Sequence, residues 1–263
     1  MKRWRVLVTH RLPDRAMEMV RSSCDLVAQP EEGRILYEDL LRRVGDAEGI
    51  LPFAVDRIDS RVLDAAPRLK VVANYAVGFD NIDVQAATAR GVLVCNTPGV
   101  LTETTADLTW ALIMAVARRV VEADRFVREK DRDFWPLGIF LGADVNGKTL
   151  GIIGMGRIGS AVARRASGFN MRVIYHDEIR LSEARERELN AEYVDMETLL
   201  RQSDFVTLHV FGSPENRHLI GPKELALMKP TAFLINAARG MVVDEAALYK
   251  ALREGAIAGS GLD

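Results

Sequence analysis

Residues 150–159 read Leu150-Gly151-Ile152-Ile153-Gly154-Met155-Gly156-Arg157-Ile158-Gly159, a G-x-G-x-x-G pattern directly after an apolar run. An amphipathic helical pattern follows from Ser160 to Phe169. A strand, a glycine turn and a helix in this order are the context in which the pattern binds a dinucleotide. Gly154 would allow the tight turn, Gly156 would let a pyrophosphate approach the backbone, and Gly159 would let the helix pack closely on the sheet. The competing interpretation is a tight strand–helix turn that binds nothing.

The residues around this turn favour NAD as the dinucleotide. The helix that follows would present free N–H groups and a partial positive charge to the phosphates, and Arg157 would add a charge-assisted contact. Asp177 ends the next apolar run, 18 positions after Gly159. An acidic residue near that distance accepts hydrogen bonds from the ribose hydroxyls and repels a 2′-phosphate, which favours NAD over NADP. Arg180 stands nearby and offers a partner for such a phosphate, so NADP stays open at this point.

Apolar runs and helical patterns alternate on both sides of the fingerprint. Before the fingerprint, apolar runs lie at 6–8, 26–27, 49–51, 71–73 and 92–94, with helical patterns at 35–44 and 84–90. A second series begins with the fingerprint and has apolar runs at 150–154, 172–177, 205–210, 232–237 and 259–263, with a helical pattern at 245–254. Continuous apolar strands that alternate with helices predict parallel sheets covered on both faces. We therefore predict an α/β protein with two doubly wound parallel-sheet domains. One long helix is predicted from Thr102 to Glu129.

The composition excludes several classes of protein. A length of 263 residues fits one large domain or two smaller ones. With 48% hydrophobic and 27% charged residues, the composition is typical of a globular protein with a real core. The net charge of −2 lacks the basic surplus of nucleic-acid-binding proteins. No apolar run reaches about 18 residues, so no membrane span is predicted. The N-terminal stretch Met1 to Val8 is predicted as a first strand rather than a signal peptide. Cys24 and Cys95 are predicted to be buried free thiols of a cytoplasmic protein.

Four further stretches carry a family resemblance. They are Asn74-Tyr75-Ala76-Val77-Gly78-Phe79-Asp80-Asn81-Ile82-Asp83, then Asn96-Thr97-Pro98-Gly99-Val100-Leu101-Thr102-Glu103-Thr104-Thr105-Ala106-Asp107, then Gly147-Lys148-Thr149 before the fingerprint, and Asn236-Ala237-Ala238-Arg239-Gly240 with Val243-Asp244-Glu245. From about residue 5 onward the sequence resembles the D-isomer-specific 2-hydroxyacid dehydrogenases, and most closely the glyoxylate and hydroxypyruvate reductases. The resemblance implies a Rossmann-like cofactor domain inserted in a flavodoxin-like substrate domain, an active site in the cleft between them, and a homodimer built around the cofactor domain. We predict the substrate domain over residues 1–100 and the NAD-binding domain over 101–263.

The resemblance assigns substrate-binding roles to Arg239, Val77 and Gly78. Arg239 follows a predicted strand, at the sheet edge where open α/β folds bind ligands. As the family's substrate arginine, it would hold the carboxylate and carbonyl oxygen of a 2-keto acid and stabilise the charge that develops on that oxygen. Backbone N–H groups at Val77 and Gly78 would bind the carboxylate, with glycine allowing the backbone geometry. The competing interpretations are a surface arginine and an ordinary turn.

The resemblance also adds residues to the dinucleotide site. They are Thr105, Ile158, Val210, Ala237, Ala238 and Asp263, the last near the nicotinamide amide. Thr105 has helix capping as an equal alternative, and a core valine is nearly as good an interpretation of Val210. Phe211 stands where the family often has proline, a departure on the adenine side. His209 is predicted to be structural. The histidines show no metal-ligand spacing, so no metal is predicted.

These features predict an enzyme that transfers hydride between NAD(H) and a small 2-keto acid such as glyoxylate or hydroxypyruvate. In the family, the histidine that protonates the carbonyl oxygen and its carboxylate partner follow the Gly261-Leu262-Asp263 motif, and the sequence stops at Asp263. We assign neither role here and expect the C-terminal return segment of the substrate domain to be missing. A 3-phosphoglycerate dehydrogenase and a non-catalytic NAD-sensing protein of the same fold stay open, although retention of Arg239 favours catalysis.

Overall fold

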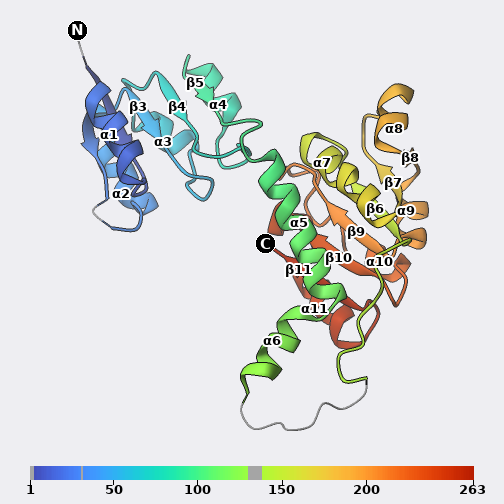
Figure 1. Ribbon diagram of the computed structural model, residues 1–263. Helices are drawn as coiled ribbons and strands as arrows, with labels where there is room; N and C mark the ends of the chain where they lie inside the picture. Colours follow the sequence, from blue (N-terminus) through green and yellow to red (C-terminus); the bar gives the residue numbers. More distant parts are fainter. Residues whose placement is uncertain (1–2, 31, 130–137) are drawn as a thin grey trace. The chain divides into compact units, whose positions relative to one another are not determined.

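The computed structural model describes residues 3–30, 32–129 and 138–263. The chain divides into two compact units, unit 1 over Met1–Val100 and unit 2 over Leu101–Asp263. Each unit contains its own sheet, and every strand pair in both sheets is parallel. Helices connect the strands in both units (Figure 1). The predicted α/β class with two doubly wound parallel sheets is confirmed.

Unit 1 is built on a five-stranded sheet in the order β2-β1-β3-β4-β5, which is a flavodoxin-like order. Its strands are β1 (Trp4–Val8), β2 (Cys24–Ala28), β3 (Gly49–Leu51), β4 (Val71–Ala73) and β5 (Leu93–Cys95), and its helices are α1 (Asp14–Ser23), α2 (Tyr37–Arg43), η1 (Val44–Asp46), α3 (Ser60–Asp64) and α4 (Val84–Ala89). The predicted strands 49–51 and 71–73 match β3 and β4 to the residue. No bounds were predicted for helices α1 and α3.

Both faces of the unit 1 sheet are covered. Ile50 and Val72 pack with Leu40 of α2 and Val62 of α3 in the larger cluster, and all four are nearly or fully buried. On the other face, Val8 packs with Met17 of α1. The strands β1 and β3 therefore have apolar residues in succession rather than in alternation, as expected where a sheet is covered on both sides. The edge strand β5 is less covered, and its Leu93 is 69% exposed.

Unit 2 is built on a six-stranded sheet in the order β11-β10-β9-β6-β7-β8. Its strands are β6 (Thr149–Ile153), β7 (Arg172–His176), β8 (Ala191–Tyr193), β9 (Phe205–Leu208), β10 (Phe233–Asn236) and β11 (Gly259–Leu262), and its helices are α5 (Thr102–Ala117), α6 (Val120–Arg128), α7 (Arg157–Ala166), η2 (Ser167–Phe169), α8 (Glu183–Leu189), α9 (Met196–Gln202), α10 (Pro222–Leu227), η3 (Gly240–Val242) and α11 (Glu245–Arg253). Counted from β6, this is the 3-2-1-4-5-6 order of dinucleotide-binding folds. The short edge strand β8 was not predicted.

Two helical layers cover the unit 2 sheet (Figure 1). Helices α5 and α7 pack on one face, where the indole N–H of Trp110 donates to the Val162 carbonyl at 3.1 Å. Helices α9, α10 and α11 pack on the other face around residues such as Leu199 and Leu248. The candidate site lies at the carboxyl ends of these strands.

The predicted single helix from Thr102 to Glu129 is wrong. Helix α5 ends at Ala117, Arg119 takes a left-handed conformation with φ 55°, and α6 starts at Val120. The Ala117 carbonyl accepts a hydrogen bond from the Ala143 N–H at 2.8 Å. This later segment takes the carbonyl that a continuous helix would use for its own hydrogen bond, so the helix breaks.

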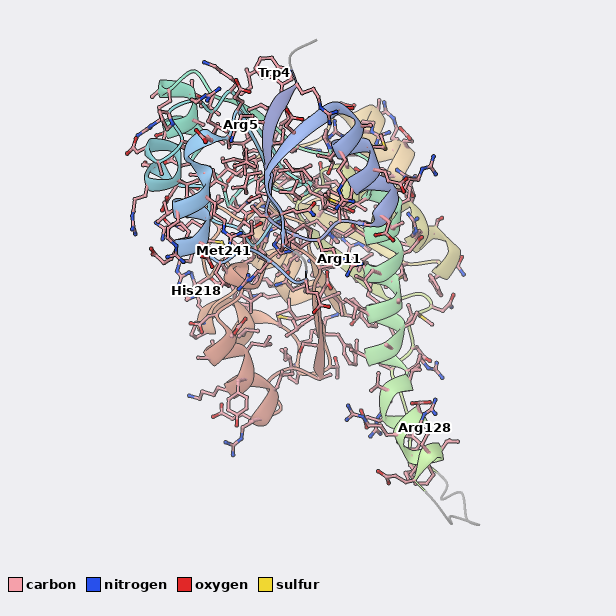
Figure 2. All side chains as sticks on the ribbon, turned by 90° about the vertical axis from the view of Figure 1, so that its left-hand side faces the viewer. Trp4, Arg5, Arg11, Arg128, His218 and Met241 are labelled. Atoms are coloured by element: carbon pink, nitrogen blue, oxygen red, sulfur yellow. The ribbon has the colours of Figure 1, made fainter. Side chains whose placement is uncertain are left out.

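The structure also tests the predictions drawn from composition. The first strand β1 begins at Trp4 and includes Arg5, both labelled in Figure 2, while Met1 and Lys2 lie outside the described residues. Both cysteines are free thiols, but Cys24 is half-buried and Cys95 is exposed, so the prediction of buried thiols is wrong. Among the described residues, no helix combines the length and apolar character needed to cross a membrane.

Candidate functional site

The strand order of unit 2 reverses between β6 and β9, and ligands bind at such a switch point beyond the carboxyl ends of the strands. Gly154 follows β6 directly with φ 94°. A Cβ atom at this position would lie 2.7 Å from the carbonyl carbon and oxygen of His209 and 2.9 Å from the Val210 nitrogen. Gly154 is therefore required by the chain itself, because the turn passes directly against the end of β9.

The other two glycines of the fingerprint have different surroundings. A Cβ at Gly159 would lie 2.1 Å from the Gly154 carbonyl oxygen and 3.3 Å from Cγ2 of Ile152, so α7 rests on the strand through this glycine. Gly156 precedes α7 as its N-cap, and a Cβ there would meet no atom within 4 Å. Packing explains Gly154 and Gly159 but not Gly156. The open space over Gly156 fits a group that must approach the backbone closely, as a pyrophosphate does.

A hollow of about 350 Å³ lies at the start of α7. Its lining comes from α5, the glycine turn, α7 and α8, namely Thr102, Glu103, Gly156, Arg157, Ser160, Arg164 and Arg185. Arg164 pairs with Glu103 at 2.7 Å, and Arg185 pairs with Glu188. Arg157 has no acidic partner in the part of the chain that the structure describes. Its guanidinium and the helix N-terminus give the hollow a positive end suited to a diphosphate.

Asp177 lies beside the glycine turn. It follows β7, and its carboxylate accepts hydrogen bonds from the N–H of Met155 at 2.6 Å and of Ile179 at 3.1 Å. One carboxylate oxygen is thus bonded to the residue between Gly154 and Gly156. An ionised carboxylate has about four acceptor positions, so two further positions remain for hydroxyl donors such as those of a ribose.

Arg180, three residues further on, is paired within unit 2. Its Nε and Nη2 donate to the Glu186 carboxylate at 2.9 and 3.0 Å, and its guanidinium lies 5.5 Å from the centre of the Tyr193 ring. Glu186 also accepts a hydrogen bond from the hydroxyl of Tyr175 at 2.8 Å. Burial, with the Glu186 hydrogen bond, raises the pKa of Tyr175 to about 12, so that hydroxyl stays a donor. A 2′-phosphate would have to compete with Glu186 for Arg180.

Asn236 organises the end of β10 and was missed in the sequence. It is 5% exposed, its amide donates to the Arg239 carbonyl at 2.9 Å, and its Oδ1 accepts from the Ala238 N–H at 3.0 Å. Its own carbonyl accepts from the Asp263 N–H at 2.9 Å. Asn236 therefore holds three predicted site residues, Ala238, Arg239 and Asp263, at the carboxyl edge of the sheet. A polar residue at the end of an otherwise apolar strand was the available signal.

The loop that carries Arg239 is fixed from a second direction. Arg239 is half-buried, and its Nη1 donates to the Ala238 carbonyl at 2.9 Å. The turn after it is held by the His218 N–H, which donates to the Met241 carbonyl at 2.8 Å; both residues are labelled in Figure 2. Arg239 thus leaves the same sheet edge as Gly154, on a loop with two sets of backbone anchors.

The remaining predicted residues of unit 2 lie at or near this edge. Val210 follows β9, is half-buried and packs against the core on the α9 side, whereas Phe211 is 71% exposed. Ala237 is half-buried and follows Asn236. Thr105 lies inside α5, and its N–H donates to the carbonyl of Leu101, the N-cap residue. The alternative role of Thr105 as a helix cap is therefore wrong.

His209 cannot supply a proton near neutral pH. Burial lowers the pKa of His209 to about 4. Its Nε2 lies 3.0 Å from the hydroxyl of buried Thr207. Both observations fit the structural role predicted for this residue. The described residues contain no group of three or more histidine, cysteine or acidic side chains that could hold a metal ion.

Val77 and Gly78 lie in unit 1, in the loop after β4. Val77 and Gly78 are half-buried. The φ angle of Gly78 is not in the left-handed region, so the glycine is not needed there for a left-handed backbone. Asn74 and Asn96 lie at the same end of the unit 1 sheet, and the sequence predicted no site role for them. Their side-chain amides donate hydrogen bonds to the carbonyls of Gly78 and Val77.

Three comparisons with known proteins agree on the family to which this chain is similar. Residues 110–263 match the family model described as "D-isomer specific 2-hydroxyacid dehydrogenase, NAD binding domain". A glyoxylate reductase from Korarchaeum cryptofilum is 54% identical over 260 residues, which is 98% of this chain and 78% of that protein. The solved D-lactate dehydrogenase from Aquifex aeolicus, complexed with NAD and lactic acid, is 31% identical with a TM-score of 0.85, over 98% of this chain and 76% of that one. The NADPH-dependent glyoxylate/hydroxypyruvate reductase from Sinorhizobium meliloti, in complex with NADP and malonate, is also 31% identical with a TM-score of 0.85, over 99% and 79%.

Proposed function

Because the chain belongs to the D-isomer-specific 2-hydroxyacid dehydrogenase family, we propose that it reduces glyoxylate or a similarly small 2-keto acid with NADH. The family makes the chain an oxidoreductase of CH–OH donors with a nicotinamide dinucleotide as its cofactor. The relatives that carry the name glyoxylate reductase are about half identical to it over nearly its whole length. Hydroxypyruvate is the next candidate, by likeness to the Sinorhizobium meliloti reductase.

One observation carries the cofactor part of the proposal. Gly156 is the fingerprint glycine that packing does not explain, and the space a Cβ would take there is open. We propose that the diphosphate of NAD(H) lies over Gly156 and accepts hydrogen bonds from the first N–H groups of α7. Arg157 and Ile158 would contribute to the same contact. When bound, the cofactor supplies the hydride, and the protein supplies orientation and charge.

Further residues would hold the adenosine and the nicotinamide. Thr105, Val210, Ala237, Ala238 and Asp263 are proposed as contacts, with Asp263 near the nicotinamide amide. Asp177 would accept hydrogen bonds from the ribose hydroxyls and would repel a 2′-phosphate. Arg180, the nearby arginine that could bind a 2′-phosphate, is paired with Glu186 instead. This pairing weakens the argument for NADP. We therefore propose NAD rather than NADP as the preferred cofactor.

Substrate recognition is assigned to Arg239 and to the Val77–Gly78 loop. The Arg239 guanidinium would bind the carboxylate and the keto oxygen, and its fixed positive charge would stabilise the negative charge that grows on that oxygen. The backbone N–H groups of the loop would bind the carboxylate. None of the four histidines of this chain is given the role of proton donor.

We propose a homodimer, with α6 in its interface. Helix α6 has no buried residue, and Val120, Val121 and Val127 on it are more than half exposed. An apolar helix face of this kind is typical of protein interfaces. A cytoplasmic location remains a prediction from composition.

The proposal is tested with the full-length protein, by following NADH oxidation with glyoxylate, hydroxypyruvate, pyruvate and 3-phosphohydroxypyruvate. Turnover of glyoxylate or hydroxypyruvate with the highest kcat/KM is expected. Preference for the phosphorylated acid would favour a phosphoglycerate dehydrogenase instead. NADH binding without turnover of any of the four acids would favour an NAD-sensing protein. If NADH does not bind at all, the dehydrogenase function is wrong.

A further inference from the structure

Three consecutive carbonyl groups of the loop after β4 are bonded from the same side. The Ala76 carbonyl accepts from the Thr97 N–H at 3.0 Å. The Val77 carbonyl accepts from the side-chain amide of Asn96 at 2.8 Å, and the Gly78 carbonyl accepts from the side-chain amide of Asn74 at 2.8 Å. All three donors come from the ends of β4 and β5, which are themselves joined by the bond from the Asn74 N–H to the Cys95 carbonyl at 2.8 Å.

This bonding orients the N–H groups on the opposite side of the loop. In a trans peptide the C=O of one residue and the N–H of the next point in opposite directions, and the described chain has no cis peptide. The N–H groups that face away from the strand ends are therefore those of Val77, Gly78 and Phe79. No group in the part of the chain that the structure describes accepts a hydrogen bond from them. Successive backbone N–H groups of this kind form anion-binding concavities.

The asparagine that holds the third carbonyl is rigid. Asn74 is 2% exposed. Its Nδ2 also lies 3.1 Å from Oδ1 of Asn81, whose own Nδ2 donates to the carbonyls of Phe53 at 3.1 Å and Asp56 at 3.0 Å. Because the Gly78 carbonyl can only accept, the Asn74 amide must present its NH₂ group there. The loop is thus fixed to the neighbouring β3–α3 turn through two side-chain amides.

The charge pattern of the loop suits a singly charged anion. One carboxylate has about four acceptor positions and can therefore accept hydrogen bonds from all three N–H groups. Residues 74–83 contain no lysine or arginine. Neutral backbone donors without a positive side chain in the same segment suit a carboxylate monoanion better than a phosphate dianion.

We propose that Asn74 and Asn96 are positioning residues that hold the N–H groups of Val77, Gly78 and Phe79 outward as a three-donor site for the substrate carboxylate. This inference rests on the proposed function and deepens it. It adds Phe79 to the site and gives two asparagines a role in substrate affinity.

The test uses oxamate, a non-reducible analogue of a 2-keto acid, added to the whole protein with saturating NADH. In ¹H–¹⁵N spectra, the amide signals of Val77, Gly78 and Phe79 are expected to shift downfield on oxamate binding. Asn96→Leu keeps the approximate size of the side chain and adds no charge but removes its donor, and should weaken oxamate at least tenfold with NADH affinity changed less than twofold. Asn96→Gln retains a donor and should recover part of that affinity. Asn146→Leu, at an exposed asparagine of unit 2, is the matched control and should match the wild-type protein.

Steady-state kinetics add a second readout. For Asn96→Leu the KM for glyoxylate should rise more than kcat falls, because the site binds the carboxylate in both ground and transition states. Asn74→Leu should have the same effect if it folds, and Asn96→Leu carries the test if it does not. Oxamate binding with the three amide signals unmoved, or with unchanged affinity in Asn96→Leu, overturns the three-donor site alone. Absence of both oxamate binding and keto-acid turnover in the wild-type protein overturns the proposed function with it.

Discussion

Replacing the fingerprint glycines one at a time separates binding from folding. In Gly156→Ala the added methyl meets no protein atom within 4 Å, and the φ angle of −70° suits alanine. Reduced freedom of the unfolded chain favours alanine by about 0.4–1 kcal/mol. The poorer N-cap costs alanine a few tenths to about 1 kcal/mol. The two effects offset each other, so the free energy of unfolding should change by less than about 1 kcal/mol.

The same methyl should weaken NADH binding strongly. It would fill the space over the backbone where the diphosphate is proposed to approach, so at least one hydrogen bond to a charged oxygen would be lost. Such bonds contribute about 1.5–3 kcal/mol each, which corresponds to roughly a 10- to 100-fold increase in Kd. Gly159→Ala behaves differently, because its methyl would lie 2.1 Å from the Gly154 carbonyl oxygen. Overpacking of this kind costs about 1–3 kcal/mol of stability.

Gly154→Ala should be the most destabilising of the three. Its methyl would lie 2.7 Å from the His209 backbone, and φ 94° is unfavourable for any L-residue with a Cβ. The two costs together come to about 2–5 kcal/mol. Stability is measured by urea unfolding and affinity by NADH fluorescence titration. Gly168→Ala is the matched control, because a Cβ there also meets nothing within 4 Å. If Gly156→Ala binds NADH as tightly as Gly168→Ala does, the diphosphate does not lie over Gly156 and the reasoning fails.

Three further predictions follow from the site. Arg239→Ala should lower kcat/KM for glyoxylate by about 10²- to 10³-fold, with Arg239→Lys intermediate and exposed Arg201→Ala unchanged in a steady-state assay. Asp177→Ser should raise the ratio of kcat/KM with NADPH to that with NADH about tenfold or more, because it removes the carboxylate that repels the 2′-phosphate; an unchanged ratio would contradict the role of Asp177. Burial lowers the pKa of His209 to about 4, below its unfolded value of about 6.5. The unfolded state therefore takes up the proton first, and stability should fall by up to about 1.4 kcal/mol per pH unit as the pH drops from 6.5 toward 4. Urea unfolding at pH 7 and pH 5 should show a smaller difference for His209→Gln than for the wild-type protein.

The sequence predicts the features of this fold whose causes are local. The strands β3 and β4 and the glycine turn after β6 each follow from a few adjacent residues, and the structure has them at the predicted positions. The break at Arg119 has a distant cause, since the Ala143 N–H takes the Ala117 carbonyl across 26 positions of sequence. Nothing within residues 102–129 signals that contact, so the helical pattern there predicted one continuous helix.

The polar residues at strand ends show the same division between local and distant causes. Asp177 and Asn74 each follow a parallel strand directly, and Asn236 is the last residue of one. Their positions could be predicted, because a polar residue after an apolar run reaches the edge where loops leave a parallel sheet. Their partners could not, because Met155 lies on a neighbouring strand's loop, 22 positions from Asp177.

These strand-end residues act on the backbone of the loops. Asp177 accepts a hydrogen bond from an N–H of the glycine turn. Asn236 bonds the Ala238 N–H and the Arg239 carbonyl. Asn74 donates a hydrogen bond to the Gly78 carbonyl in the loop after β4. A loop whose carbonyls are already bonded to its own sheet keeps its remaining N–H groups in one direction before any ligand arrives. Donors fixed in this way need no reorganisation when an anion binds. Substitutions at these positions should therefore reduce affinity through the orientation of backbone donors, even where the substituted side chain never touches the substrate.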